Sequence, residues 1–229
     1  VKDDMTDVEK ALVVHDYMAL NYKYDYDNYL NGTIPFESYR MDGLLTNKTG
    51  VCQAYAETYK YIMNLLGIDC VVVSSDSMNH AWNIIKINNE WYHVDVTWDD
   101  PVYDRIGRAR HEYFLLSDSE IKNREHYGWT TNVTADDTTY DDYFWKDIDS
   151  AIIIKDGYIF YVDDLGIRKK TGFNGISEII YPMFNVFWEV KDKEGSFWVG
   201  TFSGLGYYND RLYFNTTNSI CSIDLNGSD

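Results

Sequence analysis

The first half of the chain changes from a helical to a strand-like hydrophobic period. Between residues 55 and 66, apolar side chains recur every three or four positions, which predicts a helix. Gly67 follows, and glycine commonly ends a helix in left-handed geometry. Residues 6–9, Thr-Asp-Val-Glu, have the form of a capping box and predict another helix after them. This half is therefore expected to combine helices with a sheet.

Three strands are predicted after Gly67. Residues 68–74 form a β-branched run that is typical of a buried strand. Residues 80–87 and 91–98 predict two more strands, and Asn88-Asn89 between them indicates a hairpin with a short loop. A further short strand is expected at 112–116, followed by a helix capped by Asp118 or Ser119.

The hairpin has a register that can be worked out from its loop. If the loop has an even number of residues centred on Asn88-Asn89, paired positions sum to 177, so that His80 opposes Thr97 and Trp82 opposes Asp95. His80 and Asp95 are then diagonal neighbours on one face, roughly 7 Å apart, within reach of their side chains. A three-residue loop would place them on opposite faces.

The second half of the chain has an all-β character. Residues 151–154 and 158–162 flank Lys155-Asp156-Gly157, which indicates a hairpin, and residues 187–190 and 197–202 flank a polar turn at 191–196 in the same manner. Residues 156–161 resemble residues 209–214 at a spacing of 53. Such a period is typical of a β-repeat module or of part of a propeller.

A polar stretch at residues 130–142, rich in Thr and Asp, is the best candidate for a linker. We accordingly expect a first domain at residues 1–135 and a β-rich repeat module at residues 136–229, with a partial propeller as one form of that module.

Composition narrows the classes of function. The chain has 229 residues, of which 45% are hydrophobic and 17% aromatic, as expected of a globular protein. A formal charge of −17 argues against nucleic acid and anionic membrane surfaces as partners. No apolar run approaches the roughly 20 residues of a membrane-spanning helix, so no membrane insertion is predicted. Three scattered cysteines are too few for a disulfide framework.

Cys52 is the first candidate for chemistry. It lies at the predicted start of the helix over 55–66, after a loop with Gly50, where unpaired N–H groups and the helix dipole stabilise a thiolate. A lone cysteine there is more often a packing residue. A nucleophile also needs a base and a group that orients the base, and His80 and Asp95 are the candidates. An Asp among valines is unusual because burying a carboxylate is costly without a partner.

Three motifs carry a family resemblance. Gly-Val-Cys-Gln-Ala-Tyr-Ala at 50–56, Asn-His-Ala-Trp-Asn at 79–83 and His-Val-Asp-Val-Thr-Trp-Asp-Asp-Pro at 93–101 resemble the transglutaminase-like domain of many bacterial proteins. This superfamily is similar to the papain-like cysteine peptidases. The resemblance covers roughly residues 5–130 and implies an α+β fold with a cysteine-bearing helix on an antiparallel sheet.

The resemblance also implies roles for residues. Cys52 would be the nucleophile, His80 the general base and Asp95 the carboxylate that orients it. The Cys52 backbone N–H would bind the oxyanion, with Gln53 or Tyr39 as candidate second donors. Ala54 stands where many relatives have glycine.

Other residues have two interpretations each. Trp82 and Trp98 could wall a substrate groove or belong to an aromatic core, and His93 could lie near the site or pack. Asp99 and Asp100 are expected to cap a turn. His111, Glu112 and His126 lack metal-ligand spacing, so neither a metal nor a cofactor is predicted.

The sequence thus predicts a cysteine enzyme that transfers acyl groups from peptide or protein amides through a thioester, most simply by hydrolysis. Transglutaminase cross-linking is the alternative reaction, and a binding or scaffold module of the same fold is the non-catalytic alternative. By analogy, the acidic balance and the β appendage suit a secreted or cell-surface bacterial protein with a peptide or protein substrate, of which cell-wall peptide is one candidate. The chain begins at Val1 without a signal segment, so this expectation rests on other grounds.

Overall fold

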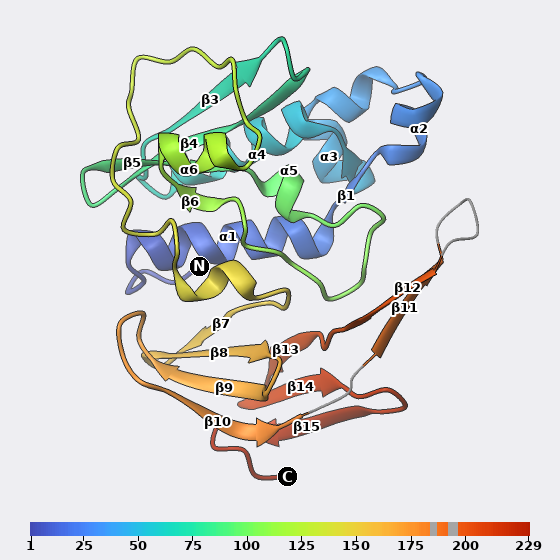
Figure 1. The fold of residues 1–229 in the computed structure, drawn as a ribbon, viewed down its shortest axis with the longest axis vertical. Coiled ribbons are helices and arrows are strands. Elements are labelled where there is room, and N and C mark those ends of the chain that lie inside the picture. The colour runs from blue at the N-terminus through green and yellow to red at the C-terminus, as the bar shows by residue number, and fades with distance from the viewer. Residues whose placement is uncertain (184–186, 192–196) are drawn as a thin grey trace. The chain divides into compact units, whose positions relative to one another are not determined.

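A computed structural model describes residues 1–183, 187–191 and 197–229. The chain forms two compact units, the first made of residues 1–104 and 110–146 and the second of residues 105–109 and 147–229. The division between Lys146 and Asp147 differs from the predicted boundary after residue 135, which falls inside the first unit. Both helices and antiparallel sheets are present, so the predicted α+β class is confirmed (Figure 1).

The first unit contains all six α-helices of the described residues. Their bounds are α1 Asp7–Asn21, α2 Tyr26–Asn31, α3 Met41–Asn47, α4 Cys52–Leu65, α5 Val96–Asp99 and α6 Asp118–Asn123. The 3₁₀ helices are η1 Phe36–Tyr39 and η2 Phe144–Asp147. The short strands β1 Lys23–Tyr24 and β2 Thr49–Gly50 pair in parallel, and the main strands are β3 Cys70–Ser75, β4 His80–Ile87, β5 Glu90–Val94 and β6 Phe114–Leu116.

Local sequence signals position these helices. The capping box before α1 is present, with the Thr6 hydroxyl accepting from the Glu9 N–H and the Glu9 carboxylate accepting from the Thr6 N–H. After α4, Gly67 has a φ of +78°, which is the left-handed geometry predicted for it. Ser117, rather than Asp118 or Ser119, caps α6, because its hydroxyl accepts from the Glu120 N–H at 3.1 Å.

The main sheet of the first unit is antiparallel, in the order β3-β4-β5-β6. Pairs such as Ile87 with Glu90 and Asn83 with Val94 sum to 177, and Asn88 and Asn89 both have positive φ, so the two-residue loop and its register are confirmed. The predicted strand over 91–98 is wrong beyond Val94, because the chain there leaves the sheet and turns into α5.

Both faces of this sheet are covered. On one face α4 packs against β3 and β4, and Asn83 donates to the Ala56 carbonyl at 2.9 Å. On the other face Trp82 packs with Trp129 and Val133. The polar stretch at 130–142 is therefore not a linker: it covers the sheet, and its Asp137 accepts from the Tyr92 hydroxyl at 2.7 Å.

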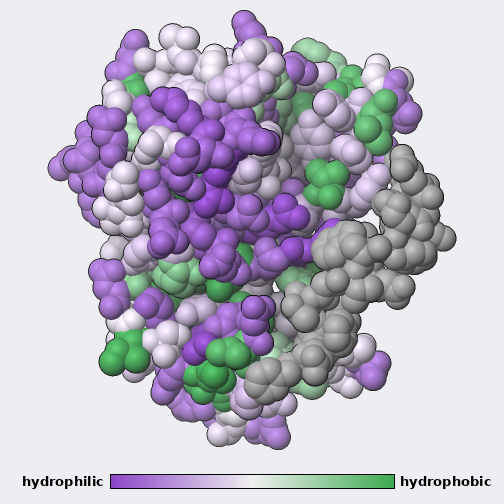
Figure 2. Space-filling model, in the orientation of Figure 1, coloured by the Kyte–Doolittle hydropathy of each residue, from purple (hydrophilic) through white to green (hydrophobic). Residues whose placement is uncertain are grey.

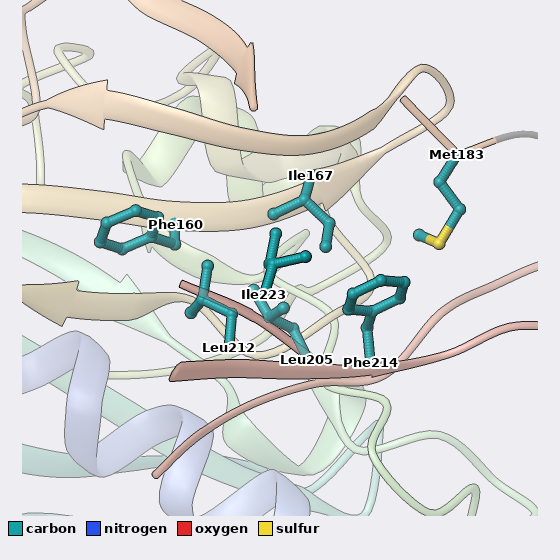
Figure 3. Packing of buried hydrophobic residues seen from close by; sticks show 7 residues of the cluster. All are labelled: Phe160, Ile167, Met183, Leu205, Leu212, Phe214 and Ile223. Carbon is teal, nitrogen blue, oxygen red and sulfur yellow. The ribbon is translucent and has the colours of Figure 1, made fainter. Parts of the chain in front are cut away.

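The second unit consists of antiparallel strands. A four-stranded sheet has the order β10-β9-β8-β7, a three-stranded sheet the order β13-β14-β15, and β11 pairs with β12. The bounds are β7 Ile153–Lys155, β8 Tyr158–Asp163, β9 Gly166–Thr171, β10 Ser177–Pro182, β11 Phe187–Lys191, β12 Phe197–Thr201, β13 Leu205–Tyr208, β14 Arg211–Asn215 and β15 Ile220–Asp224. Figure 3 shows side chains of the two larger sheets, such as Phe160 and Leu212, packing into one buried cluster.

Two segments of this unit that are similar in sequence have corresponding turns. Asp156-Gly157 joins β7 to β8 and Asn209-Asp210 joins β13 to β14, each as a two-residue loop with positive φ at both residues. The hairpin of β11 and β12 also forms as predicted. Most of its expected turn, residues 192–196, lies outside the described residues.

The face of the molecule in Figure 2 is mainly hydrophilic. Hydrophilic residues cover much of the face in Figure 2, and hydrophobic residues form small separate groups on it. Within the described residues, no helix is both long enough and apolar enough to cross a membrane.

Candidate active site

Cys52 is the first residue of α4 and is partly exposed. Its backbone N–H therefore lies among the helix N–H groups that have no partner within the helix. The chain enters this helix along a fixed path, because the Val51 N–H donates to the Ser38 carbonyl at 2.8 Å and the Asp25 N–H donates to the Gly50 carbonyl at 2.9 Å. A Cβ at Gly50 would lie 3.0–3.1 Å from neighbouring atoms, so glycine permits this close approach.

His80 and Asp95 are in direct contact. The two groups join at 2.5 Å between His80 Nε2 and Asp95 Oδ2, and both side chains are largely buried. They meet by a different route from the predicted one. His80 is the first residue of β4 and pairs with Ser75 on β3, not with Thr97. Asp95 follows β5 as the N-cap of α5.

Asp95 is a buried carboxylate whose oxygens are all used. Oδ1 accepts from the backbone N–H groups of Thr97 and Trp98, at 3.0 and 3.2 Å, and Oδ2 faces both His80 and His126. Burial raises the pKa of Asp95, but the charges and hydrogen bonds of the two histidines outweigh burial and lower it below its usual range. Asp95 is therefore an anion at neutral pH.

His80 is held in the charged form by this anion. Burial lowers the pKa of His80, but the charge and hydrogen bond of Asp95, followed by the hydrogen bond with Cys52, raise it to about 10. Since Nε2 is occupied by Asp95, Nδ1 is the ring nitrogen left for the Cys52 thiol. An imidazolium beside a thiol favours the thiolate.

Cys52 and His80 line a cleft of about 280 Å³. Gln53 and Tyr39, the predicted oxyanion candidates, line the same cleft and are exposed. His80 also lines a neighbouring cleft of about 460 Å³, where Trp98 forms part of the wall. Trp98 thus lies where a groove residue was predicted.

Trp82 has the alternative role, that of a core residue. It is 1% exposed and its ring stacks on His80, with centroids 5.6 Å apart. Its indole N–H donates to His93 Nδ1 at 2.9 Å, and His93 Nε2 lies 2.7 Å from Asp118. His93 therefore packs beneath Trp82.

Two residues near the site were missed from the sequence. Tyr24, on β1, lines both clefts, and burial followed by the nearby Cys52 raises its pKa well above the usual range. It lay in a tyrosine-rich passage without periodicity. His126 Nε2 lies 2.9 Å from Asp95 Oδ2, although 31 positions separate the two residues. Spacing gave no signal for such a contact.

Asp99 ends the single turn of α5 and Asp100 is its C-cap, with the Asp100 N–H donating to the Val96 carbonyl at 3.0 Å as predicted for a capped turn, while both carboxylates bond elsewhere. Asp99 is fully buried, with Oδ2 3.0 Å from His15 Nε2, and it accepts from the Tyr113 N–H. Asp100 accepts a 2.5 Å hydrogen bond from the Tyr55 hydroxyl. The two carboxylates thus connect the turn after Asp95 to buried polar groups elsewhere in the first unit.

That network includes a second pair of histidines. His15 Nδ1 lies 3.0 Å from Asp16 Oδ1, and the same oxygen lies 2.9 Å from His111 Nε2. Burial lowers the pKa of His15, but its bonds and charges with Asp16 and Asp99 raise it to about 9. Burial raises the pKa of Asp16, but His111 and then His15 lower it to about 2.

Within the part of the chain that the structure describes, two groups of residues have the ligand types of a metal site. His15, Asp16 and His111 form one, and His80, Asp95 and His126 the other, each with ligand atoms within 4.8 Å of one another. Ligands around tetrahedral zinc lie about 2.0–2.2 Å from the metal and therefore roughly 3.3 Å apart. The contacts that join the carboxylate to the histidines in each group are 2.5–3.0 Å long, which are hydrogen-bond lengths and shorter than this ligand spacing.

Known proteins are similar to part of the chain. A family model described as the transglutaminase-like superfamily matches residues 1–96, less than half of the chain. Kyphoscoliosis peptidase of Homo sapiens is 26% identical over 104 residues, which cover 38% of this chain and 16% of that protein. This chain thus matches about a sixth of that relative's length.

Two solved structures are similar to part of the chain. A TGase crystal structure has 17% identity and a TM-score of 0.36, covering 41% of this chain and 27% of its own. A putative cysteine protease from Cytophaga hutchinsonii has 19% identity and a TM-score of 0.31, covering 42% of this chain and 33% of its own.

Proposed function

Taking the transglutaminase-like domain at residues 1–96 as the premise, we propose that the chain is a cysteine-dependent acyl-transfer enzyme acting on peptide or protein amides. Cys52 is the nucleophile, His80 the proton carrier and Asp95 the orienting carboxylate. The observation that carries the proposal is the 2.5 Å contact between His80 and Asp95, beside a cleft that His80 shares with Cys52.

The proposed reaction proceeds through a thioester. In the resting pair the Cys52 proton is already on His80 Nδ1, and the Cys52 thiolate attacks the amide carbon to form a tetrahedral oxyanion. The Cys52 backbone N–H stabilises that oxyanion, with Gln53 or Tyr39 from the cleft wall as the second donor. His80 then returns the proton to the leaving amine. In hydrolysis, water loses a proton to His80, attacks the thioester and releases the carboxylic acid and the thiol.

Hydrolysis is our first choice, and cross-linking is the second candidate reaction. The observation that favours cross-linking is the neighbouring cleft of about 460 Å³, because it gives a second nucleophile access to His80 beside Trp98. The mass of the product separates the two. Incubation of a glutamine-containing peptide with a primary amine yields the free acid in hydrolysis and the substituted amide in cross-linking.

The first experiment measures how fast each cysteine is alkylated as a function of pH, by peptide mass spectrometry. We expect Cys52 to react rapidly, with a rate that is flat across neutral pH because His80 stays protonated up to about pH 10. His80→Ala should abolish that fast phase. Cys70 is the internal control, since burial raises its pKa to about 12 and it should react slowly.

The non-catalytic alternative makes the opposite forecast. A binding module predicts slow Cys52 labelling that rises only in alkaline solution and does not depend on His80. That outcome would contradict the proposed function. Candidate substrates, cell-wall peptide among them, should be tested only after fast labelling has been found.

A further inference from the structure

A second histidine lies on the carboxylate that orients His80. Asp95 Oδ2 is 2.5 Å from His80 Nε2 and 2.9 Å from His126 Nε2. A carboxylate oxygen only accepts, so each facing nitrogen carries a hydrogen. With Thr97 and Trp98 donating to Oδ1, four N–H groups hold Asp95, which is about as many as a carboxylate can accept.

His126 is presented by a part of the chain outside the matched residues 1–96. It follows α6, where its N–H donates to the Ile121 carbonyl at 3.1 Å, and Glu125 before it has a φ of +68°. A left-handed residue at this position turns the chain so that the His126 ring enters the interior. The ring is fully buried.

Aromatic rings enclose His126 on several sides. Its centroid lies 4.4 Å from that of Trp98, 4.9 Å from Trp82 and 5.3 Å from Tyr113. The His80 ring lies edge-on at 5.5 Å. The enclosure fixes the His126 ring, so the position of its Nε2 is set before any substrate arrives.

We infer that His126 is a positioning residue, which holds Asp95 Oδ2 in place and shares its charge, and so sets the orientation and basicity of His80. The catalytic consequence of this positioning rests on the proposed function. The hydrogen-bond arrangement can be tested separately.

Several ionisable groups lie around Asp95 and His126, and Cys52, Asp118 and Lys122 act on His80 and His93. Asp95 lies on the α5 side, His80 and His93 come from β4 and β5, Tyr113 precedes β6, and Arg124 precedes His126, its carbonyl 3.3 Å from His126 Nδ1. Burial raises the pKa of Tyr113 to about 12, so it does not titrate near neutrality.

The test compares His126→Leu, which removes the donor at similar volume, with His126→Gln, whose amide N–H can replace Nε2–H. His93→Gln is the matched control, because His93 is equally buried beside Trp82 but bonds to Asp118. The readouts are the low-field proton NMR signal of the His80–Asp95 hydrogen bond and the pH profile of Cys52 alkylation.

We expect His126→Leu to move the low-field signal and to slow Cys52 alkylation roughly tenfold at neutral pH, the effect of losing one hydrogen bond to a charged group. With His80 as the remaining partner of Oδ2, the pKa of His80 should rise. The highest pH up to which the alkylation rate stays flat should therefore rise too. His126→Gln should restore both readouts, and His93→Gln should leave both unchanged. A merely structural role would lower the fraction of folded protein without changing the highest pH up to which the alkylation rate stays flat.

An unchanged signal and an unchanged profile in a folded His126→Leu would overturn the inference. If that variant fails to fold, His126→Asn replaces it, since its shorter amide cannot reach Asp95. Equal readouts in the Asn and Gln variants would also overturn it. If Cys52 of the parent is unreactive but the NMR signal still depends on His126, the proposed function fails and the positioning role stands.

Discussion

The buried contact between His15 and its two carboxylates makes stability depend on pH. Its pKa rises from 6.5 to about 9 on folding, which corresponds to about 3 kcal/mol. Because the folded pKa is the higher one, this stability is fully present below pH 6.5 and is lost as pH rises towards 9. The perturbation is His15→Gln, which removes the titrating ring.

The assay is urea unfolding of parent and variant at several pH values, followed by tryptophan fluorescence. We expect the variant to be less stable by about 3 kcal/mol near pH 6, since breaking a buried ion pair costs about that much. The deficit should shrink to below about 1 kcal/mol near pH 10. The quantity to compare is the difference in unfolding free energy between parent and variant. His80 and Lys146, whose pKa values shift to about 10 and about 7, titrate in both proteins, so their contributions cancel in this difference.

A deficit that stays constant with pH would refute the charged network. Asp99→Asn, which keeps the shape and removes a charge, should reproduce the loss of pH dependence. Zinc should leave the melting temperature of the parent unchanged. A zinc-dependent rise that disappears in His111→Gln would mean that a metal, rather than protons, joins His15, Asp16 and His111.

Two further predictions concern the packing of η1 before Cys52 and the hydrogen bond between Tyr55 and Asp100. In Gly43→Ala the new Cβ would lie 2.0 Å from the Glu37 carbonyl oxygen, so η1 must shift; we expect slower Cys52 alkylation at temperatures where circular dichroism still shows a folded chain, and an unchanged rate would contradict this. Tyr55→Phe removes the 2.5 Å hydrogen bond to buried Asp100, and urea unfolding should show a loss of about 1–3 kcal/mol; a neutral substitution would mean that water replaces the hydroxyl.

The hairpin shows what local sequence could predict. Asn88-Asn89 fixed a two-residue loop, and the sum of 177 follows from it over the whole of β5. The approach of His80 to Asp95 was predicted on that basis, although Asp95 itself lies one residue beyond the strand. Period and turn chemistry act over a few residues, so they predict pairing well and strand ends poorly.

Contacts between distant positions could not be predicted in this way. His15 and Asp99 are 84 positions apart, and His126 and Asp95 are 31 apart. Each histidine follows no periodicity that distinguishes it from a packing residue. What reveals them is the cost of burying a carboxylate, which requires a partner but does not say where in the chain the partner lies.

The shortness of α5 has a consequence for how this protein tolerates change. The helix has four residues, Asp95 caps its start, and Asp99 ends it; the Tyr113 backbone accepts from the Asp95 N–H and donates to the Asp99 carboxylate. A single turn has no length over which to absorb a displacement. Substitutions on α1 around His15 should therefore displace His80. In a selection for restored reactivity, compensating changes should arise near Tyr113, whose backbone bonds to both Asp95 and Asp99, as readily as next to Cys52.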